Sequence, residues 1–177
     1  MSNVVITGAA RTPVGSFSGT LGAVSAHSLG TTAITAALKR SNIAPEDVSE
    51  VLMGQILPAG GRQNPARQAA IGADIPVECT AVVINQLCGS GLRSVALGAQ
   101  SMALGDSEIV VAGGQENMTL APHFVHLRNG TKMGNATLSD TMVVDGLWDA
   151  FNDIHMGSTA ENIAEKWQLT RERQDAF

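Results

Sequence analysis

Cys88 stands where a short β-branched run ends and a helical run of small residues begins, in the segment 82–105 ("VVINQLCGSGLRSVALGAQSMALG"). A helix starting near Gly89 would place the thiol at a helix N-terminus, where unpaired amides and the helix dipole favour negative charge. Such a position favours the thiolate, the nucleophilic form of cysteine. Gly89 and Gly91 leave the sulfur uncovered, and the amide of Cys88 is a candidate donor to an oxyanion. The pattern therefore predicts a nucleophile for acyl transfer.

Position alone leaves a second interpretation of Cys88 open, because a lone cysteine more commonly serves as a small buried hydrophobic residue. Two other catalytic motifs do not match. An α/β-hydrolase elbow requires glycine at the positions of Gln86 and Ser90. A papain-like site requires a second cysteine and an aromatic residue where Gly91 and Leu92 stand.

The composition is that of a folded domain. Of the 177 residues, 44% are hydrophobic and 15% are charged, which predicts a packed core. A net charge of −5 argues against a nucleic-acid-binding surface, and two cysteines, Cys79 and Cys88, suit a reducing compartment. The start "MSNVVITGAARTP" lacks a secretory pattern, and no apolar run approaches the ~18 residues of a membrane span. We therefore expect a cytoplasmic protein with neither nucleic acid nor membrane as a partner.

The elements that would position Cys88 alternate between strands and helices. Strands are predicted at residues 3–8, 49–57, 79–85 and 107–114. Helices are predicted at residues 26–38, 64–73 and 90–105, the second with Pro65 at its start, where a missing N–H is harmless. This alternation predicts an α/β fold with layers of helices and a sheet.

The chain changes character after Gly114. Residues 115–157 are rich in loops and show no clear period, and two helices are predicted to follow. The pattern "STAE", Ser158 to Glu161, predicts the first of them through a capping box. The second begins at Thr170 and reaches Phe177 after about two turns without a cap, too short to be stable alone. We expect from this that the chain continues in a longer protein.

The segment 85–119 ("NQLCGSGLRSVALGAQSMALGDSEIVVAGGQENMT") resembles the thiolase family. The segments "VVITGAARTPVGSFSGTL", "GRQNPARQAA", "APHFVHLRNGTKMG" and "HMGSTAENIAEKWQL" resemble the same family in the same order. The similarity runs through essentially all of the chain. The letters "CGSG" at the cysteine resemble the biosynthetic, short-chain branch.

The resemblance implies the thiolase fold, two similar β-α-β-α-β-α-β-β halves with a loop domain inserted into the first. Residues 1–118 would form the layered α-β-α N-terminal domain without its final strand, and residues 119–177 the beginning of the loop domain. That final strand and the C-terminal half would lie beyond Phe177. The resemblance also implies a homodimer or homotetramer that assembles through the N-terminal half.

The chemistry that the resemblance implies is acyl transfer between coenzyme A thioesters. Cys88 would take the acetyl group of one acetyl-CoA, and a second acetyl-CoA would attack it in a Claisen condensation that makes acetoacetyl-CoA, with thiolysis as the reverse. The thioesters are substrates, so neither a cofactor nor a metal is implied. The family's catalytic histidine, asparagine and second cysteine have no counterpart here, which implies that this chain alone is inactive. Cys79 matches no family motif.

Three further residues resemble positions that line the pantetheine and acyl pocket of thiolases: Leu147, His155 and Met156. Without the resemblance, a leucine and a methionine in a loop would be assigned to packing, and His155 to a local hydrogen bond. His123 and His126 form an H-x-x-H pair, but two ligands are too few for a metal site, so we assign them to loop structure.

Two alternatives stay open beside the acetoacetyl-forming enzyme. A longer-chain 3-ketoacyl-CoA thiolase remains possible because chain-length selectivity depends partly on residues outside this sequence. A truncated, non-catalytic thiolase module that binds a partner or supports assembly is the alternative of another class.

Overall fold

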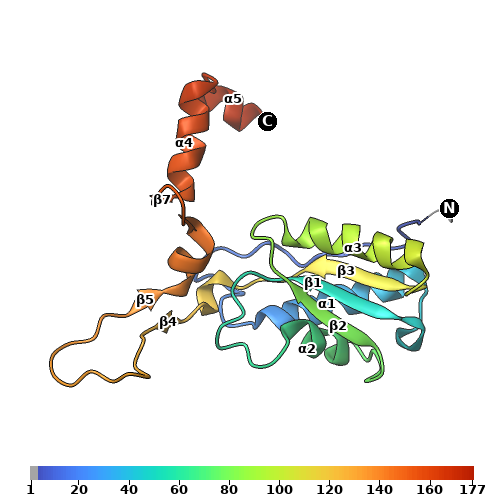
Figure 1. Ribbon diagram of the computed structural model, residues 1–177. Helices are drawn as coiled ribbons and strands as arrows, with labels where there is room; N and C mark the ends of the chain where they lie inside the picture. Colours follow the sequence, from blue (N-terminus) through green and yellow to red (C-terminus); the bar gives the residue numbers. More distant parts are fainter. Residues whose placement is uncertain (1–3) are drawn as a thin grey trace. The chain divides into compact units, whose positions relative to one another are not determined.

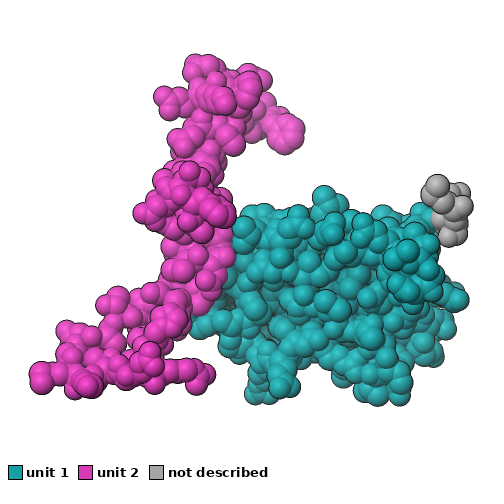
Figure 2. Space-filling view, in the orientation of Figure 1, with its two compact units in different colours: residues 1–122 teal, residues 123–177 magenta. Residues whose placement is uncertain are grey.

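The computed structural model describes residues 4–177, which divide into two compact units after Pro122 (Figures 1 and 2). The first unit contains the sheet and three helices, and the second, His123–Phe177, contains short strands and two helices. The sequence places its domain boundary after Met118, within the short 3-10 helix η2, Met118–Leu120, and the chain divides just after this turn.

A three-stranded parallel sheet organises the first unit. β1 (Glu50–Gly54) lies between β2 (Thr80–Ile84) and β3 (Val110–Gly114). The pairing is in register along all five residues, from Glu50 opposite Thr80 and Val110 to Gly54 opposite Ile84 and Gly114. Parallel pairing requires a crossover connection between consecutive strands, and each crossover here contains a helix. Three of the predicted strands and the α/β class are therefore confirmed.

Helices cover both faces of this sheet (Figure 1). α1 (Ala26–Ser41) and α2 (Pro65–Gly72) lie on one face, and α3 (Ser90–Leu104) lies on the other. The side chain of Ser25 caps α1 by accepting from the amide of Ser28, and Asn64 caps α2 directly before Pro65. A 3-10 turn, η1 (Pro45–Asp47), leads into β1. All three predicted helices of this unit are confirmed.

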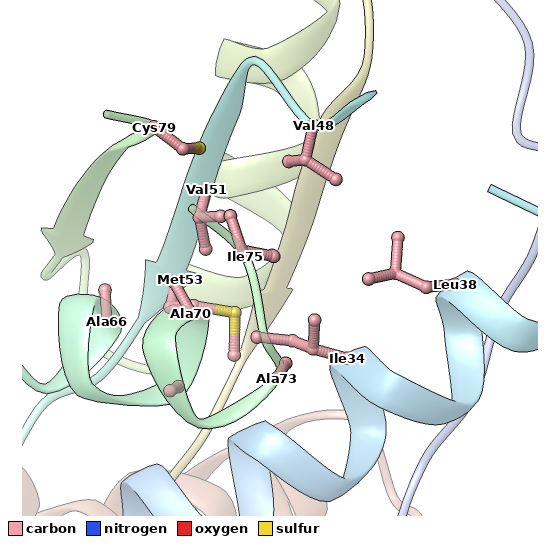
Figure 3. Packing of buried hydrophobic residues seen from close by; sticks show 11 residues of the cluster. Ile34, Leu38, Val48, Val51, Met53, Ala66, Ala70, Ala73, Ile75 and Cys79 are labelled. Atoms are coloured by element: carbon pink, nitrogen blue, oxygen red, sulfur yellow. The ribbon is translucent and has the colours of Figure 1, made fainter. Parts of the chain in front are cut away.

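The hydrophobic core lies between the sheet and the helices α1 and α2 (Figure 3). Val51 and Met53 of β1 meet Ile34 and Leu38 of α1 there, with Ile75 from the turn after α2. Leu52 alternates to the opposite face and is 5% exposed, so the central strand is buried on both sides. Burying side chains of this size stabilises the fold by roughly 1.5–3 kcal/mol each.

The prediction of a first strand at residues 3–8 is wrong for the part that the structure describes. Residues 4–8 run without a strand assignment, and Asn3 lies outside the described residues. Val5 and Ile6 are 68% and 80% exposed, while the carbonyl of Ala9 accepts from Arg40 of α1. A strand needs a neighbour for its amides and carbonyls, and among the residues that the structure describes this segment has none.

The second unit contains two short hairpins followed by two helices. β4 (His123–Phe124) pairs with β5 (Ser139–Asp140), and β6 (Trp148–Asp149) pairs with β7 (Ile154–His155), both antiparallel. A wide helical turn, η3 (Met142–Leu147), leads into β6, and the helices are α4 (Met156–Lys166) and α5 (Arg171–Ala176). None of the helices within residues 4–177 has the length and apolarity to cross a membrane.

The two predicted helices of this unit differ in how well their starts were placed. α5 begins as predicted, with the side chain of Thr170 accepting from the amide of Arg173. The predicted start of α4 was wrong, because the helix begins at Met156 and not at the capping box of Ser158. The cap is His155, whose ring accepts from the amide of Gly157 and which lies three residues before Ser158.

The sheet and α3 approach each other closely at the carboxyl ends of β1 and β3. A Cβ atom on Gly54 would lie 2.6 Å from the carbonyl carbon of Ser90 and 2.7 Å from the amide nitrogen of Gly91. On the same side, the hydroxyl of Ser94 donates to the carbonyl oxygen of Gly113 at 2.8 Å. Only glycine at position 54 allows the first turn of α3 to rest on the strand ends.

Gly54→Ala should therefore lower the free energy of unfolding by about 3 kcal/mol, because a backbone contact cannot relax as a flexible side chain can. Gly91→Ala is the matched control, since the nearest atom to its Cβ is 3.9 Å away. The control should leave stability unchanged or raise it slightly, because alanine is favoured over glycine in a helix. Urea unfolding followed by circular dichroism measures both; equal stabilities would contradict the close contact.

Candidate active site

Cys88 lies one residue before the N-cap of α3. β2 ends at Ile84, Gly89 is the N-cap, and the helix begins at Ser90, as the sequence predicted to within one residue. In the part of the chain that the structure describes, Cys88 is exposed to solvent. It is therefore not the small buried hydrophobic residue that the alternative interpretation supposed. Gly89 supplies no side-chain cap, and the first turn of a helix leaves amides that favour a negative charge. The thiol is thus accessible at the N-terminal end of a helix, where the amides of Gly89 and Ser90 already donate to the carbonyls of Gln86 and Leu87.

The loop that carries Cys88 is held in an unusual backbone conformation. Leu87, directly before the cysteine, has φ +47°, a left-handed conformation that costs a non-glycine residue roughly 1–3 kcal/mol. The hydroxyl of Ser90 accepts from the amide of Gln86 at 2.8 Å and donates to the carbonyl of Leu87 at 2.6 Å. Asn85 accepts from the amide of Leu87 at 3.0 Å. These three hydrogen bonds fix the loop on both sides of Cys88.

Cys79 has the opposite environment. It is 6% exposed and belongs to the core between the sheet and α2 (Figure 3). Burial raises the pKa of the Cys79 thiol, an effect that nearby Arg67 opposes and Glu50 reinforces. The guanidinium of Arg67 donates to the backbone carbonyls of Val77 and Cys79, which ties α2 to the chain entering β2. Cys79 is a packing residue.

The structure brings together the three residues predicted to bind substrate. Trp148 of β6 pairs with His155 of β7; Leu147, the last residue of η3, directly precedes β6, and Met156, the first residue of α4, directly follows β7. Leu147, His155 and Met156 are all half-buried. The rings of Trp148 and His155 meet edge to face with centroids 6.3 Å apart. These residues belong to the second unit, and Cys88 belongs to the first.

The turn of this hairpin is closed by the carboxylate of Asp149. It accepts from the side-chain amide of Asn152 at 2.7 Å and from the backbone amide of Phe151 at 2.8 Å. These hydrogen bonds, the side-chain one foremost, lower the pKa of Asp149. Across the turn, the indole of Trp148 donates to Asp153 at 2.7 Å. The hairpin is therefore a defined support for His155.

The hydrogen bond of His155 determines where its proton resides. The amide of Gly157 donates to Nδ1 at 2.9 Å, so this nitrogen is an acceptor and carries no proton. In the neutral imidazole the proton must then reside on Nε2, which is a donor. His155 thus combines the cap of α4 with a donor available to a ligand.

The H-x-x-H pair forms local contacts of the first hairpin. Nε2 of His123 lies 3.9 Å from a carboxylate oxygen of Asp140, its partner in the β4–β5 pairing. His126 packs edge to face against Phe124 at 5.0 Å. Within residues 4–177, no group of three or more His, Cys, Asp or Glu side chains is arranged to hold a metal ion.

The sequence interpretation missed three residues near the Cys88 loop: Asn85, Ser90 and Glu116. The hydroxyl of Ser90 and the side-chain amide of Asn85 hold the loop itself, and Glu116 is the second residue after β3. A signal for Glu116 was present, because polar residues just after the strands of a parallel sheet gather at one edge, where ligands commonly bind.

Iodoacetamide should modify Cys88 and spare Cys79 in the folded protein, at rates that differ by about 100-fold or more, because one thiol is accessible and the other is buried with a raised pKa. Peptide mass spectrometry over a time course measures both rates. Cys79 should become reactive only in urea. Equal modification without urea would contradict the burial of Cys79.

His155→Ala should weaken the start of α4 by about 1 kcal/mol, because the amide of Gly157 loses its acceptor. His155→Asn should keep the cap, since asparagine is among the preferred N-cap residues. Hydrogen exchange of the first α4 amides should be about fivefold faster in the alanine variant only. Identical exchange in both variants would show that the ring does not cap the helix.

Comparison with known proteins identifies the family. Residues 4–177 match the family described as "Thiolase, N-terminal domain". Acetyl-CoA acetyltransferase of Rhizobium meliloti is 59% identical and that of Paracoccus denitrificans 56%; each alignment covers the whole chain and 46% and 45% of the relative. The cytosolic acetyl-CoA acetyltransferase of Rattus norvegicus is 58% identical over 97% of the chain and 43% of its own length. The chain therefore spans about half the length of these relatives, and it belongs to the thiolase family as its N-terminal domain.

Proposed function

We propose that this chain supplies the nucleophile of an acetyl-CoA C-acetyltransferase, an enzyme that makes acetoacetyl-CoA from two molecules of acetyl-CoA and catalyses thiolysis in reverse. The observation that carries the proposal is the exposed thiol of Cys88, held one residue before the N-cap of α3 by a loop of defined geometry. The names of its relatives support the choice of acetyl-CoA as substrate.

The first half-reaction is an acyl transfer to sulfur. The thiolate of Cys88 attacks the thioester carbonyl, its sulfur bonds to that carbon, and the bond from the carbon to coenzyme A sulfur breaks. The acetyl group stays on Cys88, and coenzyme A leaves as a thiol after gaining a proton. The backbone amide of Cys88 itself is suited to stabilise the oxyanion that forms in between.

The second half-reaction is the Claisen condensation. A second acetyl-CoA loses an α-proton, and its carbanion attacks the acetyl carbon, so that a carbon–carbon bond forms and the bond to Cys88 sulfur breaks. The base for this proton, and the histidine and asparagine implied by the resemblance, have no counterpart in this chain. We assign them to polypeptide that the longer relatives contain.

The hairpin of the second unit would hold the pantetheine arm. Leu147 and Met156 offer apolar surface, and the Nε2–H of His155 offers a donor to an amide carbonyl or the thioester oxygen. Coenzyme A thioesters are the substrates, and we propose no separate cofactor and no metal. Residues 119–177 would then be the beginning of a loop domain that binds substrate, and residues 1–118 the domain that carries the nucleophile.

Assembly and location follow the same proposal. β2 is at one edge of the sheet, and its residue Val82 is 45% exposed. An edge strand of this kind is available for pairing with a second copy, which supports a homodimer or homotetramer assembled through the N-terminal half. We place the protein in the cytoplasm.

Cys88→Ser should abolish acetyl transfer, with a rate at least about 1000-fold lower, because the hydroxyl is a far weaker nucleophile. The protein, expressed as its gene encodes it, is incubated with acetyl-CoA, and peptide mass spectrometry measures acetylation at Cys88. Thiolysis of acetoacetyl-CoA is measured in parallel. Cys79→Ser is the matched control and should retain both reactions.

The outcomes separate the candidate functions. Acetylation at another residue, or none at a reactive Cys88, would contradict the proposal and favour a non-catalytic module. A faster reaction with longer 3-ketoacyl-CoA than with acetoacetyl-CoA would favour the longer-chain thiolase.

A further inference from the structure

We propose that Glu116 is a positioning residue for Cys88, which acts through the backbone of Ile56 and the side chain of Asn85. The proposal rests on the acyl transfer proposed above, because it concerns the orientation of the attacking sulfur.

Glu116 anchors the segment that follows β1. One of its carboxylate oxygens accepts from the amide of Ile56 at 2.8 Å and from the amide of Leu57 at 3.2 Å. Hydrogen bonds to an ionised carboxylate are among the stronger ones in proteins. The preceding residue, Gln115, adds a backbone bond to the carbonyl of Gly54 at 2.9 Å. The end of β3 therefore fixes the path of the chain after β1.

That segment in turn holds the nucleophile loop. The carbonyl of Ile56 accepts from the side-chain amide of Asn85 at 3.4 Å, and the carbonyl oxygen of the Asn85 side chain accepts from the amide of Leu87 at 3.0 Å. Leu87 is the left-handed residue directly before Cys88. A continuous series of contacts thus runs from Glu116 through Ile56 and Asn85 to the residue that directs the Cys88 side chain.

The other oxygen of Glu116 argues against a purely stabilising role. It is buried, and it accepts no hydrogen bond from the residues that the structure describes. Desolvating a carboxylate oxygen without a partner is unfavourable, and a neutral side chain would avoid much of this cost. Buried polar groups without a hydrogen-bond partner are expected mainly where function requires them. The carboxylate is explained if its two charge-assisted bonds are needed to hold the loop rigidly.

The test uses the protein as its gene encodes it and compares two reactions of Cys88. Acetylation by acetyl-CoA depends on the orientation of the sulfur, whereas alkylation by iodoacetamide needs only an accessible thiol. Acetylation of Cys88 by acetyl-CoA requires an aligned sulfur, and small misplacements slow such reactions roughly 10- to 100-fold. Glu116→Ala and Asn85→Ala should each slow acetylation by this factor, and the double variant should be no slower than the slower single variant. Iodoacetamide alkylation of Cys88 should change by less than about threefold, since the thiol stays accessible.

Two controls accompany these variants. Glu116→Gln keeps an acceptor for both amides but loses the charge, so it should slow acetylation less than Glu116→Ala does. Glu50→Ala removes a half-buried carboxylate that accepts from Ser107 at 3.2 Å at the opposite end of β1, and it should not slow acetylation. Alkylation of Cys79 reports unfolding in any variant, because this thiol is buried in the folded core. If Glu116→Ala unfolds, Asn85→Ala still tests the proposal, because Asn85 lies in an exposed loop.

Three results would overturn the positioning role: wild-type acetylation in Asn85→Ala or folded Glu116→Ala, equal losses in Glu116→Gln and Glu116→Ala, or additive losses in the double variant. Each leaves the proposed function intact, because wild-type Cys88 is still acetylated. Failure of the wild-type protein to acetylate a readily alkylated Cys88 is a different result, and it would overturn the proposed function together with the inference.

Discussion

The close contact between Gly54 and the first turn of α3 is the constraint on which the site depends. Because no Cβ separates them, the backbone of Ser90 and Gly91 rests directly on the end of the central strand. Ser94 and Gly98 continue this small-residue face along the helix, where Gly98 lies against Val110 of β3. The position of Cys88 is therefore defined relative to the most buried strand of the unit, and its loop cannot shift without moving α3.

Parallel topology explains why the polar groups gather beside this cysteine. The three strands run in the same direction, so the residues after Gly54, Ile84 and Gly114 lie together at the carboxyl ends of the strands. Asn85 and Glu116, thirty-one residues apart in the chain, meet there through Ile56. Loops at the carboxyl edge of such sheets commonly carry ligand sites because a rigid scaffold holds several of them together. The half-buried carboxylate of Glu116 lies here because the parallel strands bring their carboxyl ends together.

The sequence predicted the elements with a local signal and missed what depends on distant partners. Pro65 and Thr170 sit at helix starts as predicted, since capping and proline geometry act over a few residues. The segment 4–8 has a strand-like composition, but pairing requires a neighbour that composition does not supply. The start of α4 was misplaced because a histidine ring acts as its cap in place of Ser158.

The same distinction applies to the site. The exposure of Cys88 beside α3 followed from the letters around it, because the change from β-branched to small residues marks the end of a strand and the start of a helix. The left-handed conformation of Leu87 and the contacts of Glu116 did not follow, since they depend on atoms brought together by the register of β1 with β2 and β3. Leu147, His155 and Met156 were assigned by resemblance; in the structure His155 pairs with Trp148 in the hairpin, and Leu147 and Met156 are the residues directly before and after its two strands.

The in-register pairing of β1 with β3 has a consequence for synthesis on the ribosome. β1 ends at residue 54 and β3 at residue 114, so the strand ends that support the cysteine meet only after both have left the exit tunnel. Until then the nascent polypeptide presents an unoriented thiol at position 88. The orientation of this thiol is in this sense acquired late, as a property of the assembled sheet, because the strands that fix it are synthesised one after another.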